Sequence, residues 1–132
     1  MRFPGKGFCY MKRTDNVILE KIVGYCDDID SLLERYNRDF EKYTSDIAFQ
    51  YACNMCIIQI GELVTRLSGE LQESHKEIPW RAIKGMRNVH AHDYEKVDFD
   101  IVWNTLTKEI PDLRAKVMDI LREISTDKEE LR

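Results

Sequence analysis

A segment near the middle of the chain is apolar on almost every side when it is drawn as a helix. Apolar residues follow helical spacing from residue 47 to residue 67, and the stretch YACNMCIIQIG at 51–61 has few polar positions. Other elements must cover such a helix, which is typical of the centre of a helical bundle. Thr44, Ser45 and Asp46 offer N-caps before it, and Ser68-Gly69 marks its end.

The remaining periodicity predicts further helices around this one. Apolar spacing marks a first helix over 15–40 and a third that opens at Ile78-Pro79-Trp80 and stops near 90–93. A fourth is capped by Asp98 or Asp100, and a fifth restarts at Pro111. Residues 70–77 are interpreted as a polar connection, and no strand signal or glycine-rich phosphate loop is present. We therefore predict an all-α, up-and-down bundle of four or five helices.

Length and composition limit the class of protein. The 132 residues suit one domain. We divide the chain into an N-terminal extension at 1–10, a helical domain at 11–124 and a charged tail at 125–132. No uninterrupted apolar run approaches the roughly 20 residues of a membrane span, and residues 1–10 lack the features of a signal peptide. We expect a cytoplasmic protein without a membrane partner.

Charge and cysteine content exclude other functions. A formal net charge of −4 argues against sequence-blind coating of nucleic acid, although it is compatible with a local basic cleft. Cys53 and Cys56 lie three residues apart in an apolar helix, with no second cysteine pair and no nearby histidine. We interpret them, with Cys9 and Cys26, as thiols that pack like small apolar groups. We therefore expect no metal site and no cofactor.

The functional signal is concentrated in the sequence GMRNVHAHDY at 85–94, where a predicted helix ends. Arg87 offers a planar fork of donors that matches phosphate, and His90 and His92 can exchange protons near neutral pH. Tyr94 adds a phenol. Cleavage of a phosphodiester beside a ribose 2′-hydroxyl needs a proton-transfer group and a cation, and it requires no metal. The set is therefore compatible with metal-free cleavage of RNA.

Simpler interpretations stay open for the same residues. Arg87 suits a helix C-terminus or a surface ion pair, a histidine is often a hydrogen-bonded bystander, and Tyr94 suits a half-buried core position. A metal pair of His90 and His92 has no evident third ligand. Arg87 and His92 also diverge by about 140° on an unbroken helix. They converge if the helix unwinds near His90 or if a second subunit supplies the complement.

The segment from Arg87 to Tyr94 reads R-N-x-x-x-H-x-Y, which resembles the R-x4-H-x-Y signature of HepT-like HEPN proteins. The flanking segments IPWRAIKGMRN and VDFDIVWNTLTKEIPDLR resemble the same family, as do NMCIIQIGELVTRLS and MKRTDNVILEKI. The resemblance covers about residues 11–124. His90 stands where the family pattern has an aliphatic residue, and Asp93 stands where it has glycine.

The resemblance implies a dimeric HEPN bundle that acts as a metal-independent endoribonuclease toxin of a type VII toxin–antitoxin system. Arg87 and His92 would be the catalytic pair at a dimer cleft, with Asn88 as a supporting polar neighbour. An MntA-type minimal nucleotidyltransferase would be the antitoxin and would AMPylate Tyr94. The alternatives are a non-catalytic helical partner or substrate-binding subunit of that nucleotidyltransferase, and a helical dimer with a degenerate site.

Overall fold

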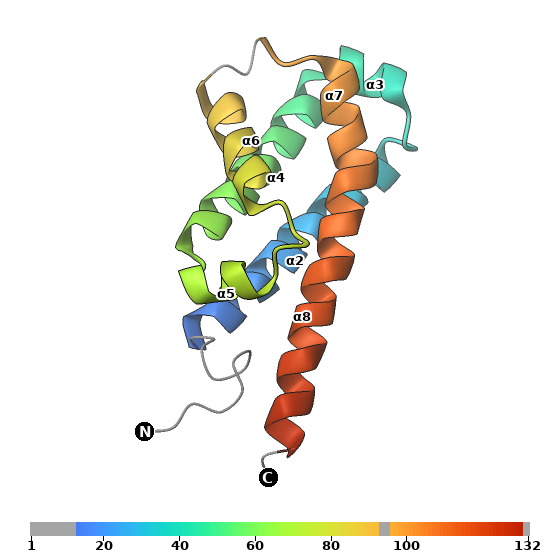
Figure 1. Cartoon of the computed structure of the whole chain (residues 1–132). Helices are drawn as coiled ribbons and strands as arrows, with labels where there is room; N and C mark the ends of the chain where they lie inside the picture. The colour runs from blue at the N-terminus through green and yellow to red at the C-terminus, as the bar shows by residue number, and fades with distance from the viewer. Residues whose placement is uncertain (1–12, 93–95, 131–132) are drawn as a thin grey trace.

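The computed structural model describes residues 13–92 and 96–130, and all the regular structure in these ranges is helical (Figure 1). The prediction of an all-α fold is confirmed. The elements in chain order are α2 (Arg13–Arg35), α3 (Phe40–Ser45), α4 (Ile47–Arg66), α5 (Gly69–Ser74), α6 (Trp80–His92), α7 (Phe99–Asn104), the π-helical turn η2 (Thr105–Glu109) and α8 (Ile110–Glu130).

The long helices run alternately up and down, as Figure 1 shows for α2, α4, α6 and α8. Helix α4 packs against both α2 and α6, and α2 also packs against α8. Asp46 caps α4 by accepting a hydrogen bond from the Phe49 amide at 3.0 Å. The fully buried side chains at the centre include Leu19, Ile22, Ile29, Leu33, Phe49, Ile57, Ile60, Val64 and Leu106. The central position predicted for the apolar segment is correct.

One face of α4 is nevertheless uncovered in the single chain. Ile47, Tyr51 and Met55, spaced four residues apart, are 61%, 57% and 55% exposed. Helices α2 and α6 cover the opposite side of α4, which carries Phe49 and Ile57. By length and mean hydropathy α4 also suits a membrane span, and it is the one such helix among the residues described.

The first helix is shorter than the periodicity predicted. Helix α2 ends at Arg35, and Asn37 and Arg38 take left-handed backbone conformations with φ of 58° and 51°. Asn accepts this conformation more readily than most residues, which favours a helix end here. Phe40 belongs to the separate helix α3, where its ring lies 5.5 Å from that of Trp103. Phe40 is therefore half-buried, and the apolar spacing assigned it to the wrong helix.

The prediction of a polar connection at 70–77 is wrong for residues 70–74, because Gly69–Ser74 form helix α5. The Ser68 hydroxyl caps this helix and accepts a hydrogen bond from the Leu71 amide. The buried carboxylate of Asp15 in turn accepts from the Ser68 amide at 2.9 Å and the Ser68 hydroxyl at 2.6 Å. A cap and one buried leucine suffice for a short helix that has no long apolar pattern.

The fourth and fifth predicted helices form one continuous rod. Asp98 is the cap of α7, and α7 passes through η2 directly into α8. The Ile110 amide donates to the Thr105 carbonyl five residues back, and this wider turn accommodates Pro111 in the first turn of α8. Helix α8 continues to Glu130, past the predicted boundary at 124. Residues 1–12 lie outside the described residues, so the proposed N-terminal extension stays a prediction.

Candidate active site

Helix α6 crosses α4 at Gly61 and Arg87. A Cβ atom added to Gly61 would lie 2.2 Å from the Arg87 Cβ and 3.2 Å from the Arg87 Cα. Real Cβ atoms do not approach other carbons this closely, so the crossing requires glycine at position 61. This glycine therefore allows a close approach of the two helices.

The same crossing orients the Arg87 guanidinium. Its Nη2 donates to Glu62 Oε2 at 3.3 Å, and its Nη1 donates to Asn88 Oδ1 at 2.7 Å. The buried Nε lies 3.3 Å from Glu62 Oε1 in an ion pair, although it is not directed at that oxygen as a hydrogen bond. Each terminal nitrogen retains a second N–H, and the side chain is 30% exposed. Arg87 is therefore a partly buried, oriented cation with donors left for an anion.

His90 is buried at the same interface, with 6% of the residue exposed. Its Nδ1 is hydrogen-bonded to Asn54 Oδ1 on α4, and Asn54 Nδ2 donates to the His90 carbonyl at 3.5 Å. Burial lowers the pKa of the imidazole below its ordinary value, because the charged form loses its hydration. His90 is therefore a neutral, interhelical residue.

His92 is the last residue of α6, but its side chain lies outside what the structure describes, as do Asp93 and Tyr94. The structure brings Arg87 and Asn88 together and leaves their relation to His92 and Tyr94 as a prediction. Helix α6 runs without interruption through His90, so the unwinding that would have brought positions 87 and 92 together does not occur. The two positions stay about 140° apart around the helix axis.

Glu62 and Asn54 are residues of this site that the sequence did not identify as candidates. Both occupy polar positions in the mostly apolar central helix, one beside Gly61 and the other two turns earlier. A buried polar group requires a partner, so a polar residue in such a segment is a signal for an interhelical contact.

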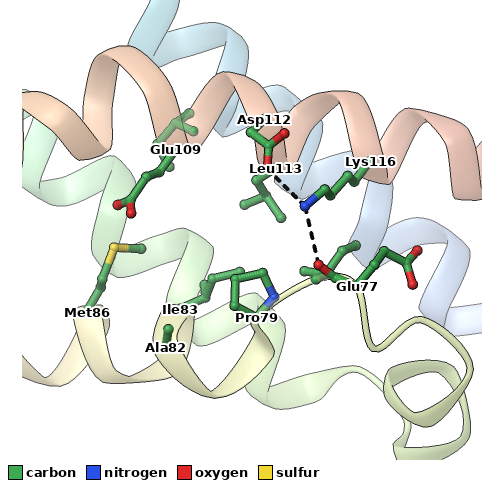
Figure 2. A pocket seen from close by; sticks show the side chains of 11 residues that line it. Glu77, Pro79, Ala82, Ile83, Met86, Glu109, Asp112, Leu113 and Lys116 are labelled. Carbon is green, nitrogen blue, oxygen red and sulfur yellow. Dashed lines mark hydrogen bonds and ion pairs between the residues drawn. The ribbon is translucent and has the colours of Figure 1, made fainter.

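A separate cavity of about 330 Å³ lies between α6 and α8 (Figure 2). Glu109 and Asp112 are acidic residues of its lining, and Lys116 pairs with Asp112 at 3.0 Å and donates to the main-chain carbonyl of Glu77, another lining residue, at 3.3 Å. Its apolar lining consists of Ile78, Pro79, Ala82, Ile83, Met86, Ile110 and Leu113. Acidic residues outnumber the single lysine in this lining, so the cavity offers less attraction to a phosphate group than an arginine with free donors does.

The cysteines in the described residues pack as predicted. Cys26, Cys53 and Cys56 are buried free thiols, and burial raises the pKa of Cys26 and Cys53 to about 12 and that of Cys56 to about 11. Such thiols stay protonated near neutral pH and behave as small apolar groups. Cys9 lies outside the described residues. Within the described ranges, no group of three or more His, Cys, Asp or Glu side chains is arranged to hold a metal ion.

Comparison with known proteins identifies the family of this bundle. A model of the family described as Ribonuclease HepT-like matches residues 22–120, which include the α4–α6 crossing and the motif at the end of α6. The chain belongs to this family. The HepT-like assignment made from the sequence is therefore confirmed.

Three relatives match over nearly their whole length. A protein of Caldanaerobacter subterraneus subsp. tengcongensis, named "Putative RNase", is 36% identical over 83% of this chain and 96% of its own. A protein of Methanocaldococcus jannaschii, also named "Putative RNase", is 32% identical over 86% of this chain and 92% of its own. A "Probable ribonuclease HepT" of Thermococcus cleftensis is 32% identical over 80% of this chain and 94% of its own. No solved structure matches the chain.

Proposed function

We propose that this protein is a metal-independent endoribonuclease, the toxin of a type VII HepT/MntA-like toxin–antitoxin system in the cytoplasm. The observation that carries the proposal is the Arg87 guanidinium, which Glu62 and Asn88 hold at the helix crossing five residues before His92. The ribonuclease names of the HepT-like relatives support RNA as the substrate.

In the proposed reaction, His92 manages the protons and Arg87 stabilises negative charge. His92 removes the proton from a ribose 2′-hydroxyl, the 2′-oxygen attacks phosphorus, and the bond from phosphorus to the 5′-oxygen breaks. A proton passes to that leaving oxygen, and a 2′,3′-cyclic phosphate remains. The free N–H groups of Arg87 bind the phosphorane-like transition state, in which the charge on the phosphorus oxygens is greatest.

A second copy of the chain would complete the site. Ile47, Tyr51, Met55 and Glu62 fall on one stripe of α4, so the exposed apolar surface leads directly to the Glu62–Arg87 ion pair. A partner that covers this stripe also reaches Arg87. Because α6 is continuous and separates positions 87 and 92, the geometry favours an Arg87 from one subunit beside a His92 from the other.

The first test is RNA cleavage in excess EDTA by wild-type protein, Arg87→Ala and His92→Ala. Arg81→Ala is a matched control, because Arg81 is an exposed arginine of the same helix. Both site variants should lose about 100-fold or more in rate, and the control should not. Intact mass is measured beforehand, so that an AMP-blocked sample is not counted as inactive. Unmodified wild-type protein that leaves varied RNAs intact would favour the non-catalytic partner of a nucleotidyltransferase.

Mixing the two inactive variants tests the composite site. A mixed dimer of Arg87→Ala and His92→Ala contains one complete pair if the residues come from different subunits. After subunit exchange, the mixture should recover about a quarter of the wild-type rate. A mixture that stays inactive although mixed dimers form would place both residues in the same subunit's site.

The proposed antitoxin is an MntA-type nucleotidyltransferase that transfers AMP to Tyr94. The nucleotides would add negative charge two residues from His92 and repel RNA. With this enzyme and ATP, the wild-type protein should gain the mass of one or more AMP units and lose RNase activity. Tyr94→Phe should gain none, although Tyr51 remains 57% exposed as an alternative acceptor. AMP on the Phe variant would assign the acceptor to another residue.

A further inference from the structure

Asn54 and His90 form a polar clasp between α4 and α6 that the proposed reaction does not use. The Asn54 side chain contacts His90 twice, through the ring Nδ1 and through the main-chain carbonyl. A carbonyl oxygen only accepts hydrogen bonds, so the Asn54 amide nitrogen must face it. The Asn54 oxygen then faces the ring and accepts from Nδ1–H. The geometry therefore defines the tautomer of His90 as well as its position.

Such a pair of hydrogen bonds fixes the relative orientation of the two helices more than it stabilises the fold. Burying an amide and an imidazole costs desolvation that their mutual hydrogen bonds only offset, whereas two aliphatic side chains would gain from burial. Hydrogen bonds instead require one relative placement of the two helices. The contact of Gly61 with Arg87 defines where α6 meets α4. One turn later on α6, the contact of Asn54 with His90 defines the rotation of α6 about its own axis.

We propose that Asn54 and His90 are positioning residues, which hold the last turn of α6 and therefore set where His92 stands relative to Arg87. The inference rests on the proposed ribonuclease function and extends it. His90 lies three residues after Arg87 and two before His92, so a rotation of this turn would move His92 relative to the helix crossing that holds Arg87. His90 itself is 6% exposed and engaged with Asn54, so it acts through its neighbours and not on the RNA.

The kinetic test compares Asn54→Leu and His90→Leu with Gln72→Leu. Gln72 is the matched control because its half-buried amide also donates to main-chain carbonyls, those of Val64 and Leu67, away from α6. Per folded molecule, each clasp variant should lose about 10- to 100-fold in kcat with KM changed less than about twofold. The double variant should lose no more than either single one, because both remove the same contact. Clasp variants with the kcat of Gln72→Leu would overturn the proposal.

A measurement that does not depend on RNA cleavage separates this inference from the proposed function. Nitrogen-15 NMR of the histidine rings should show His90 as the neutral Nδ1–H tautomer in the wild-type protein. The ring signals of His92 should shift in Asn54→Leu and stay in place in Gln72→Leu. Unchanged His92 signals in Asn54→Leu would show that the clasp does not position His92. Absence of wild-type cleavage would instead overturn the ribonuclease proposal alone.

Discussion

Gly61 of α4 lies directly against Arg87 of α6, with only 2.2 Å between the Arg87 Cβ and the place where a Cβ on residue 61 would stand. The missing side chain lets Glu62, the next residue, reach the guanidinium at 3.3 Å from two of its nitrogens. One glycine therefore both allows the helices to cross and orients the charge of the candidate site.

Replacing Gly61 with alanine should destabilise the fold and lower activity together. The added methyl group meets Arg87 backbone and Cβ atoms that cannot move without shifting α6, which costs about 1–3 kcal/mol. Gly24→Ala is the control, because nothing lies within 4 Å of a Cβ at that position in α2, and it should stabilise by about 0.4–1 kcal/mol. Urea unfolding gives the free energy of unfolding of both variants, and the RNA-cleavage assay gives their activity. Equal effects of the two substitutions would show that the crossing tolerates a wider spacing.

Glu62→Gln should show whether Glu62 orients the Arg87 guanidinium, which affects kcat, or contributes to the binding of RNA, which affects KM. The amide keeps the shape of the side chain but weakens the ion pair, so Arg87 loses its fixed direction and kcat should fall about 10-fold. KM should not rise, because a negative charge beside the phosphate site is removed. Steady-state kinetics with Glu123→Gln, an exposed carboxylate of α8, provides the control. A rise in KM with unchanged kcat would contradict this role.

Met55→Asp should dissociate the proposed dimer and reduce cleavage. A carboxylate in the middle of the α4 stripe would be buried against the partner, at a cost of about 3 kcal/mol or roughly 100-fold in Kd. Ile101→Asp is a matched control on α7, where Ile101 is 66% exposed. Sedimentation velocity gives the oligomeric state of each. If Met55→Asp stays dimeric, this stripe is not the interface.

The buried imidazole of His90 should make stability depend on pH. Its pKa is lowered in the folded protein, whereas the unfolded chain titrates near its ordinary value of about 6.5. Below pH 6.5 the unfolded state binds the proton first, so stability falls as pH falls until the folded-state pKa is reached. The contribution has a slope of at most about 1.4 kcal/mol per pH unit.

His90→Leu isolates the contribution of His90 to the pH dependence of stability, because all other titrating groups are common to the wild-type protein and the variant. Urea unfolding of the two proteins between pH 7 and pH 5 should show wild-type stability decreasing more steeply than that of the variant. Parallel curves would mean that His90 does not titrate differently in the folded and unfolded states.

Local sequence patterns were enough to predict the helical class and the central place of residues 47–67, and they also single out residues 85–94 as the candidate site. These features depend on local periodicity and on residue type, which the chain displays directly. The cap at Asp46 and the end of α6 near His92 are local in the same sense. The R-x4-H-x-Y signature likewise needs only neighbouring residues, and the match to the HepT-like family confirms the family that it indicated.

The contacts between residues distant in the chain depend on how the helices pack. Gly61 and Arg87, and Asn54 and His90, are 26 and 36 residues apart, and no local pattern specifies which turn of α4 faces which turn of α6. The helix at Gly69–Ser74 likewise begins at Ser68, which donates to Asp15, a residue 53 positions earlier in the chain. Packing selects among several local conformations of similar energy, so the helices were predictable and their register was not.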